Sequence, residues 1–503
     1  MSLSSEIEHS NFKTKNNYKA RYYRITCYML LFTLKSTCAF IRSGVPSPQQ
    51  FIGRHYKSHR LFSMAVPQKQ VTRCNGAADE LPVNTSITND NIIESKAKLI
   101  SSSLESLTKA GQRIREGHLV SFPTETVYGL GCHALDPVAV KRVFEAKERP
   151  LTDPLIVHVN EGKTALDLWD ASSSHFTDNG KKHEQMEKMV LQALVEEFWP
   201  GPLTIVAKAS PKVPSIIMAN TGFVACRSPS HPIARSLIEV SEVPIAAPSA
   251  NKFGHVSPTK ASHVFDDLGM ENVWIVDPFL KDENSNVNGS SSTDTSTNTD
   301  HNVVCNVGVE STVAKVEYTP GNLGLISVLR HGAISIHEIS RCLEKAGLSN
   351  DFRVKGKHQA TGDDVNNVAP GQTIRHYSPN VQSFMIAHDA YSKQSIDDQT
   401  LSSRLSKEEI CNLESAVIID FGGRLSCLRE KALAYRDLSQ DGDSGVAATN
   451  VFDVLRWSET QSGAKRVYFP EIVVSEDADE ALVLAVKDRL TRAASGVIIT
   501  SLI

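Results

Sequence analysis

Short apolar runs alternate with amphipathic stretches between residues 93 and 350, which is the pattern of an α/β domain. Its clearest unit begins with the run LVSF, a predicted buried strand at residues 119–122. A polar turn follows, and then a helix that Asp136-Pro137 begins, since Asp is a favoured N-cap and Pro a favoured first helical residue. A second apolar strand is predicted at residues 155–159. The unit therefore reads strand, polar turn, helix, cationic turn, strand.

The remaining elements of this domain follow from the same periodicities. We expect a helix from Ile93 to Glu116, where Leu104 and Leu107 share one side, and an irregular surface loop at residues 172–188. A polar segment at 284–302 has almost no apolar residue and is predicted to be a disordered insertion. Further helices are expected at 191–198, 232–240 and after Ser257, and further strands at 203–206, 223–227, 308–313 and 328–334.

A second α/β pattern begins at Val381, after a polar stretch from Lys355 to Asn367 that suits a linker. Residues 416–420 are predicted to form a buried strand, and residues 452–457 and 480–494 to be helical. Residues 467–474 read as one strand interrupted at Pro470. We expect a small Rossmann-like sheet here.

Composition narrows the possible functions. The 503 residues leave room for two or three domains, and the net charge of −4 argues against nucleic-acid binding by bulk electrostatics. Nine cysteines occur without CxxC or Cys/His ligand spacing, which argues against a structural zinc site and a disulfide framework.

Residues 1–92 have the character of a targeting or disordered region. No acidic residue occurs between Glu8 and Asp79, and the apolar run at residues 25–34 is too short to span a bilayer. We expect a transit peptide for import into a plastid or mitochondrion. The alternative is a disordered tail, with a cytoplasmic form that starts at Met64.

Cationic and hydroxyl side chains recur where the predicted strands end. In α/β sheets, ligands collect at one edge of the strands, and several guanidinium groups there require an anionic partner such as phosphate or carboxylate. The chain has neither a GxxxxGK[ST] loop nor a GxGxxG turn after a strand. A nucleotide would therefore be held by side chains on an open concave sheet. The strand-end residues are Arg149, Arg227, Ser249, Ser311 and Arg330.

Seven motifs occur in a fixed order: PTETVYGLG, KERP with PLIVH, WPGPLT, VACRSPSHP, APSAN, GVEST and LRHGAIS. Together they resemble the two-domain, Sua-type branch of the YrdC/Sua family of threonylcarbamoyl-AMP synthases. The resemblance implies a YrdC-like domain with an open twisted concave sheet at 93–350, and a linker at 351–380 that closes over the active site. A smaller, Rossmann-like, Sua-type domain would then occupy 381–503.

By this resemblance the chain would be a nucleotidyltransferase. It would condense L-threonine, bicarbonate (or CO2) and ATP to threonylcarbamoyl-AMP and pyrophosphate, with Mg2+ held through ATP and no metal site of the protein. A partner transferase would use the product to modify the adenosine beside the anticodon of tRNA. Weak contact with tRNA is possible in such a family, and no membrane association is expected of the mature form.

The resemblance also assigns roles to residues. Asp153 stands where many family members have Asn, and a carboxylate facing triphosphate would be repelled unless Mg2+ or Lys147 offsets it. The implied catalytic residues are Lys147, Arg149, Ser249 and Asn251. The implied L-threonine site is Thr126, His158, Arg227, Ala247 and Ser311. The implied ATP site is Arg149, Asp153, Phe223, Ser249, Ser257, Arg330 and Tyr377.

Plainer interpretations remain open beside these roles. Lys147 and Arg149 could be solvated residues at a helix end, and Ser249 with Asn251 could only close a turn. The segment around Tyr377 could be a rigid connector between two prolines. The alternative function is a module that binds tRNA or double-stranded RNA on its basic concave sheet, although few aromatic residues lie in these motifs for base stacking.

Overall fold

The computed structural model describes residues 95–170, 178–281, 304–318, 323–356, 367–370, 376–388, 406–474 and 481–500. The predicted targeting region, the insertion at 284–302 and residues 371–375 of the linker lie outside these ranges. Among the helices in the described ranges, none combines the length and apolarity needed to cross a bilayer.

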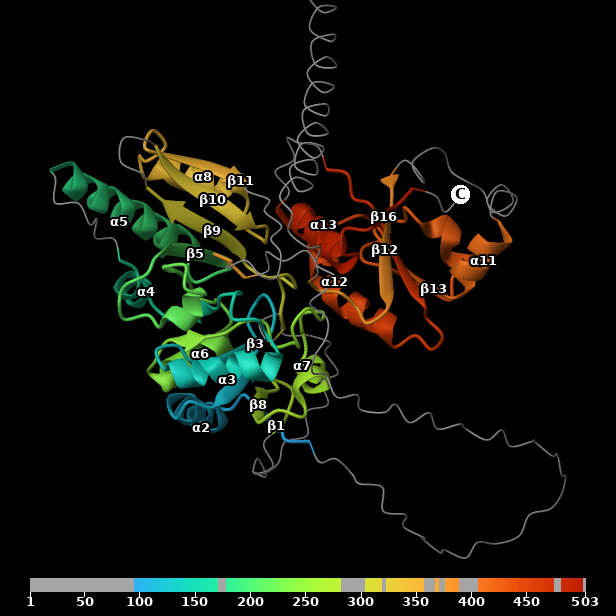
Figure 1. Cartoon of the computed structure of the whole chain (residues 1–503), viewed down its shortest axis with the longest axis horizontal. Coiled ribbons are helices and arrows are strands. Elements are labelled where there is room, and N and C mark those ends of the chain that lie inside the picture. Colours follow the sequence, from blue (N-terminus) through green and yellow to red (C-terminus); the bar gives the residue numbers. More distant parts are fainter. Residues whose placement is uncertain are drawn as a thin grey trace, which may run out of the picture. The chain divides into compact units, whose positions relative to one another are not determined.

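A mixed sheet of 11 strands dominates the first half of the described chain (Figure 1). It contains parallel pairs, such as β4 with β6, and antiparallel pairs, such as β2 with β3. In sheet order the strands are β1 (Lys98–Ile100), β8 (Val273–Val276), β2 (Leu119–Phe122), β3 (Gly129–His133), β7 (Ile245–Ala246), β4 (Ile156–His158), β6 (Phe223–Arg227), β5 (Leu203–Lys208), β9 (Thr312–Glu317), β10 (Gly324–Arg330) and β11 (Phe352–Gly356).

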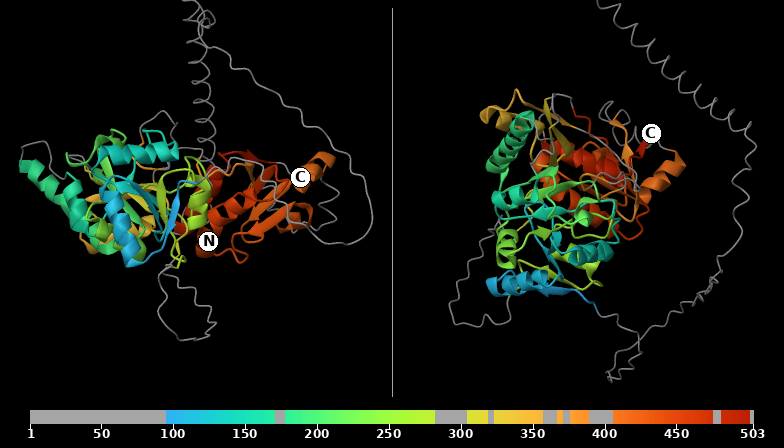
Figure 2. Two further views of the ribbon diagram at one scale, coloured as in Figure 1. Left: turned by 90° about the horizontal axis from the view of Figure 1, so that it is seen from below. Right: turned by 60° about the vertical axis from the view of Figure 1, so that its left-hand side comes forward.

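Helices cover the whole of one sheet face but only part of the other. On the fully covered face, apolar residues of α3 (Pro137–Lys147), α4 (Gly162–Leu168), α5 (Asp178–Phe198), α7 (Ala261–Leu268) and α8 (Ile336–Lys345) form one core with the strands. On the opposite face, α2 (Leu104–Arg115) and α6 (Pro232–Ser241) pack together over β2, β7 and β8. Figures 1 and 2 show α5 running beside the strands β9 to β11.

Alternation along the strands leaves the site on the part of the face that α2 and α6 do not cover. In β4, Val157 joins the helix-covered core, whereas Ile156 and His158 point the other way. In β6, Val224 and Cys226 enter that core, so Arg227 lies on the opposite face. The period of two therefore gathers polar strand-end residues on one open surface.

The second sheet consists entirely of parallel pairs, as expected for a Rossmann-like unit. Helices α12 (Ser444–Glu459) and α13 (Ala481–Ala493) pack on one face, and α11 (Lys407–Glu414) packs on the other. The strand order is β14 (Ala434–Asp437), β13 (Ala416–Asp420), β15 (Arg466–Pro470), β12 (Gln382–Ile386) and β16 (Ile498–Ile499).

Several predicted elements differ from the structure. Residues 98–100 form an edge strand rather than the start of the helix predicted from Ile93, and Leu104 is exposed. Residues 178–188, predicted as part of a loop, begin α5. The predicted strand at 472–474 is absent, because β15 ends at Pro470. Strand β11 at 352–356 pairs with β10 inside the stretch predicted as linker.

Candidate functional site

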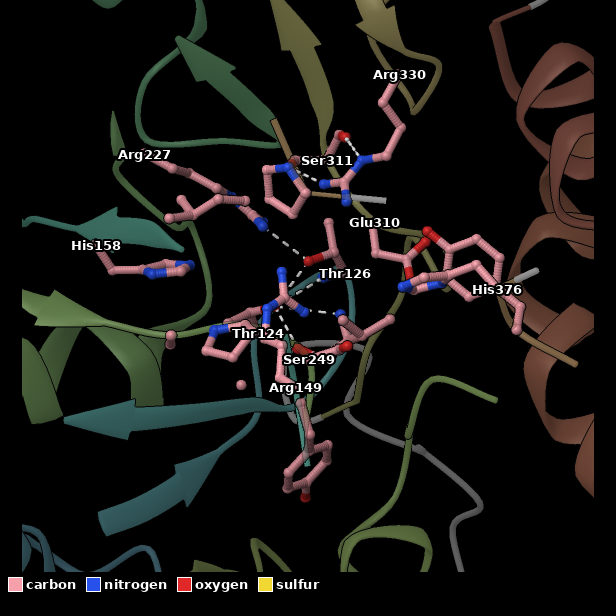
Figure 3. A pocket seen from close by; sticks show the side chains of 18 residues that line it. Thr124, Thr126, Arg149, His158, Arg227, Ser249, Glu310, Ser311, Arg330 and His376 are labelled. Atoms are coloured by element: carbon pink, nitrogen blue, oxygen red, sulfur yellow. Dashed lines mark hydrogen bonds between the residues drawn. The ribbon is translucent and has the colours of Figure 1, made fainter. Parts of the chain in front are cut away.

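One pocket collects most of the residues that the sequence singled out (Figure 3). Arg149, Arg227, Ser249 and Arg330 all line it, although they come from four separate segments of the chain. The linker contributes Pro370, His376 and Tyr377 to the same wall. The lining residues are Thr124, Thr126, Val127, Tyr128, Gly129, Arg149, Ile156, His158, Arg227, Ala247, Pro248, Ser249, Glu310, Ser311, Arg330, Pro370, His376 and Tyr377.

Arg149 enters the pocket because α3 ends abruptly. Glu148 adopts a left-handed conformation with φ 56°, and the N–H of Arg149 donates to O of Phe144 at 2.9 Å. The guanidinium forms an ion pair with Asp153 at 2.9 Å between Nη2 and Oδ2, and also donates to O of Pro154 at 2.9 Å. Burial lowers the pKa of Arg149, and Asp153 opposes that effect. Asp153 thus lies against Arg149, which accounts for a carboxylate beside an anion site.

Arg227 is held from three sides. Its Nη2 lies 2.7 Å from Oε1 of Glu125, its Nη1 donates to Oγ1 of Thr126 at 2.9 Å, and its Nε donates to O of Gly201 at 3.3 Å. Burial would raise the pKa of Glu125, but the charge and hydrogen bond of Arg227 outweigh it, so that the pKa is lowered. The guanidinium therefore keeps a fixed direction toward the pocket.

His158 lies beside this arginine as a neutral imidazole. Burial and the charge of Arg227 lower its pKa to about 3. The Phe122 ring packs edge-on against it, with ring centroids 6.2 Å apart. Among the described residues, no side chain or backbone group pairs with its Nδ1, which leaves a polar atom in the pocket wall able to meet a ligand.

Ser311, directly before β9, and Arg330, the last residue of β10, form a second polar group. Arg330 donates from Nε to O of Ser311 and from Nη2 to its Oγ, each at 3.0 Å. The pairing of β10 with β9 shifts between Val328 and Arg330, which is a bulge of the kind that re-aims side chains. Thr204 on β5 is hydrogen-bonded to Ser311 through their hydroxyls at 2.7 Å.

Lys147 lies behind the pocket wall rather than in it. Its Nζ donates to the carbonyl oxygens of Ser249, at 2.7 Å, and of Asn251. Burial, followed by the charge of Arg149, lowers its pKa well below the ordinary value. Asn251 in turn donates to O of His255 at 2.8 Å. Lys147 and Asn251 therefore fix the backbone that presents Ser249.

The linker reaches the pocket in a strained conformation. Tyr377 has φ 62°, in the left-handed region that side chains other than glycine rarely adopt, and none of its surface is exposed. His376 packs against it with ring centroids 4.1 Å apart. Neither the Tyr377 hydroxyl nor Nδ1 of His376 has a hydrogen-bond partner among the described residues. Strain together with unsatisfied buried polar atoms indicates a segment arranged for binding.

Three residues predicted for the ATP site do not line the pocket. Asp153 pairs with Arg149, Ser257 donates to Oε1 of Glu310 at 2.6 Å, and Phe223 lies under Nζ of Lys315, 3.7 Å from the ring centroid. Asp153 and Ser257 therefore act through neighbours that line the pocket, Arg149 and Glu310, whereas Lys315 beside Phe223 does not line it. The cause is that side chains in consecutive positions of a strand or turn point in different directions.

The sequence interpretation missed Thr124, Glu310 and His376 as pocket residues. Glu310 could have been found, because it directly precedes Ser311 in the motif GVEST, and His376 directly precedes Tyr377. Across the part of the chain that the structure describes, no group of three or more His, Cys, Asp or Glu residues could hold a metal ion.

Two family models match the chain side by side. The Sua5/YciO/YrdC model, described as "Telomere recombination", matches residues 112–295. The model described as "Threonylcarbamoyl-AMP synthase, C-terminal domain" matches residues 334–495. The first match spans β2 to β8 of the large sheet, and the second spans α8, β11 and the parallel sheet as far as α13.

Several curated relatives are named threonylcarbamoyl-AMP synthase. The threonylcarbamoyl-AMP synthase of Pyrococcus abyssi is 38% identical over 273 residues, which is 54% of this chain and 65% of the relative. That of Schizosaccharomyces pombe is 34% identical over 284 residues, 54% of this chain and 62% of the relative. The chain thus aligns with somewhat less than two thirds of their length. It aligns with 83% of the Vibrio vulnificus (strain YJ016) threonylcarbamoyl-AMP synthase, at 30% identity.

The fold matches a solved structure over most of both chains. The crystal structure of P. abyssi Sua5 complexed with L-threonine superposes with a TM-score of 0.58 at 30% sequence identity. The match covers 80% of this chain and 99% of that one. The large mixed sheet and the parallel C-terminal sheet are therefore the architecture that the resemblance implied.

Proposed function

The chain belongs to the Sua5/YrdC family, and on that basis we propose that it is a threonylcarbamoyl-AMP synthase. It would condense L-threonine, bicarbonate or CO2, and ATP to threonylcarbamoyl-AMP and pyrophosphate, as a nucleotidyltransferase. The observation that carries the proposal is the shared pocket: three arginines from separate segments meet there with the hydroxyls of Thr126, Ser249 and Ser311 (Figure 3).

The pocket has two chemically different ends. Arg227 with Thr126 and neutral His158 suits a small amino acid, because a guanidinium can take a carboxylate bidentately and a neutral imidazole can accept a hydrogen bond. Arg149, Ser249, Arg330 and Tyr377 also line the pocket, and the two cations among them suit a triphosphate. We assign the first group to L-threonine and the second to ATP.

The reaction needs positioning more than a nucleophile from the protein. The neutral amine of threonine attacks the carbon of CO2 and loses a proton, or attacks bicarbonate with loss of water, and a carbamate results. A carbamate oxygen then attacks the α-phosphorus of ATP in line, while the bond to the pyrophosphate oxygen breaks. Arg149 and Arg330 would stabilise the charge that builds on the phosphates. Cys132 and Cys226 are buried, and burial raises the pKa of both thiols, so neither has the features of a nucleophile.

Magnesium would arrive on ATP. The carboxylates nearest the pocket arginines, Asp153 and Glu125, are paired with Arg149 and Arg227, which suits a role in orienting cations rather than in binding metal. Mg2+ bound to phosphates would neutralise part of their charge. The protein groups then need only orient the α-phosphorus toward the carbamate.

The deciding experiment uses the purified full chain with ATP, bicarbonate and magnesium, and supplies one amino acid at a time. We expect pyrophosphate release that depends on L-threonine, together with a product of the mass of threonylcarbamoyl-AMP. Alanine, which lacks the hydroxyl, is the control for amino-acid selectivity. Pyrophosphate release that is independent of any amino acid would reject the synthase.

The wider setting is also proposed. The product would feed a transferase that modifies the adenosine beside the tRNA anticodon, and the basic N-terminal stretch would direct the chain to a plastid or mitochondrion. Expression of residues 1–92 fused to a fluorescent protein tests the second part. Fluorescence that remains in the cytosol would instead favour the cytoplasmic form that starts at Met64.

A further inference from the structure

The C-terminal unit, which consists of the parallel sheet β12 to β16 and its helices, reaches the pocket wall through a buried arginine. Arg489 lies on α13 and has 0% of its surface exposed. Its Nε and Nη2 donate to Oε2 of Glu310 at 3.1 and 3.0 Å, and its Nη1 donates to O of His331 at 2.6 Å. The guanidinium also lies over the ring of Tyr377, 5.6 Å from the centroid. One side chain therefore contacts three segments that belong to the pocket or adjoin it.

These hydrogen bonds are made by residues adjacent in sequence to the polar pair Ser311 and Arg330. Glu310 directly precedes Ser311, and His331 directly follows Arg330. Ser311 and Arg330 are themselves joined by two hydrogen bonds of 3.0 Å. The same guanidinium thus contacts the residues on both sides of this pair, beside the shift in strand register between Val328 and Arg330.

Glu310 extends the effect to a further residue. Its Oε1 accepts a hydrogen bond from Ser257 at 2.6 Å, while its other oxygen is held by Arg489. Glu310 also lines the pocket. Without Arg489, this buried carboxylate would lose its ion-pair partner, and such a group seeks the nearest cation or reorganises its surroundings. Arg330 lines the same pocket, where burial lowers its pKa and the charge of Glu310 already opposes that effect.

We propose that Arg489 is a positioning residue for the ATP end of the pocket. It neutralises Glu310 and holds the backbone of His331, so that Arg330 stays directed at the phosphates instead of at Glu310. The inference rests on the proposed function, since it assumes that Arg330 meets ATP. It gives the C-terminal unit a direct part in substrate binding.

The test compares Arg489→Met with Arg456→Met in the full chain. Arg456 is also a buried arginine of the C-terminal unit; it pairs with Asp267 at 3.1 Å and donates to O of Val256, and none of these residues lines the pocket. We expect Arg489→Met to raise the KM for ATP about tenfold or more, and the KM for L-threonine by less than about twofold. Arg456→Met should lower the melting temperature and leave both KM values unchanged. KM does not depend on the fraction of folded enzyme, so partial unfolding cannot imitate the result.

A second variant separates positioning from simple packing. Glu310→Gln on the Arg489→Met background removes the unpaired charge, so the KM for ATP should return to within about threefold of that of the Glu310→Gln single variant. An unchanged KM for ATP in Arg489→Met, or no recovery in the double variant, would overturn the proposal.

The proposed function fails separately, if the wild-type chain releases no threonine-dependent pyrophosphate. ATP affinity measured by calorimetry on the same variants would then decide the role of Arg489 by the same comparison.

Discussion

Each of the three arginines in the pocket is held in place by oxygen atoms of the protein. Arg149 is paired with Asp153, Arg227 with Glu125, and Arg330 with the backbone and hydroxyl of Ser311. Fixing a long side chain in advance removes the entropy cost of ordering it on binding. The guanidinium groups are therefore preorganised for anions, which is what a mechanism based on positioning requires.

Substitution of Arg149 should impair ATP use selectively. Arg149→Ala removes a charge-assisted phosphate contact of about 1.5–3 kcal/mol, so we expect pyrophosphate release at limiting ATP to fall about ten- to hundredfold. Arg142→Ala is the matched control, because Arg142 is an exposed residue of α3, the helix that ends just before Arg149, and it donates to O of Gly117. Equal rates for the two variants would remove Arg149 from the site.

His158 should remain neutral over the range in which the protein is folded. Its pKa of about 3 lies far below the usual value, because burial and Arg227 disfavour the charged form. We therefore expect the affinity for L-threonine, measured by calorimetry from pH 5 to 8, to show no step near pH 6.5. His158→Gln should weaken binding without changing that profile. A step near pH 6.5 that disappears in His158→Gln would show that His158 does titrate there.

Among the elements, those with a strong local signal were predicted well. Strand β2 and helix α3 lie where the apolar run and the Asp136-Pro137 cap indicated, and Asp136 accepts a hydrogen bond from the N–H of Val138. Strand β3 was not predicted, since the stretch between residue 122 and Asp136 read as a polar turn. In the structure β3 pairs with β2, and Gly131 faces Val120 across the pair.

Gly131 should not tolerate a side chain. A Cβ there would lie 2.8 Å from Cγ2 of Ile245 and 2.8 Å from Cε1 of Phe122, both fully buried. We expect Gly131→Ala to lower the free energy of unfolding by about 1–3 kcal/mol in urea denaturation. Gly356→Ala is the control, because Gly356 lies exposed on β11 and its new methyl would meet only Cδ1 of Ile336 at 3.3 Å. Similar midpoints for wild type and Gly131→Ala would show that the core repacks around the methyl group.

Considered as a whole, the described chain has one apolar cluster that joins residues from both halves. Val127 and Val309, beside pocket residues Thr126 and Glu310, pack with Val451 and Val486 of the C-terminal helices. A polar contact adds to this core, the ion pair of Arg489 with the pocket residue Glu310 at 3.0 Å. Loops that form the pocket are therefore supported from the C-terminal unit.

Alkaline pH should weaken this support through His255. Burial alone would lower its pKa, but hydrogen bonds to Asp267 at 2.8 Å and Glu459 at 3.0 Å outweigh burial and raise the pKa to about 9. Since the folded state binds the proton more tightly, the contribution is complete below about pH 6.5 and is lost as pH rises through 9. Between pH 7 and 9.5 we expect the free energy of unfolding to fall by on the order of 2 kcal/mol. The melting temperature should fall with it.

The control for this effect is His255→Gln, which should be less stable at pH 6.5 and should lose most of the decline at higher pH. The same slope in both proteins would mean that another group titrates. The nearby ion pair of Lys260 with Asp453 does not involve His255 and is retained in this variant, so this polar contact is the same in both proteins.

The amino-acid sequence alone determined the chemistry and much of the local structure. This includes the hydroxyls near Arg149 and Arg227, the helix caps and the alternating strands. Each of these features depends on neighbours within a few residues. The convergence of those side chains on one surface came from sheet register, which pairs segments as far apart in the chain as β1 and β8. The roles of Asp153, Glu310 and Arg489 depended on it too. A buried charge acquires its function from the partner that packing places beside it, and no short window of sequence contains the partner of Glu310, 179 residues away on α13.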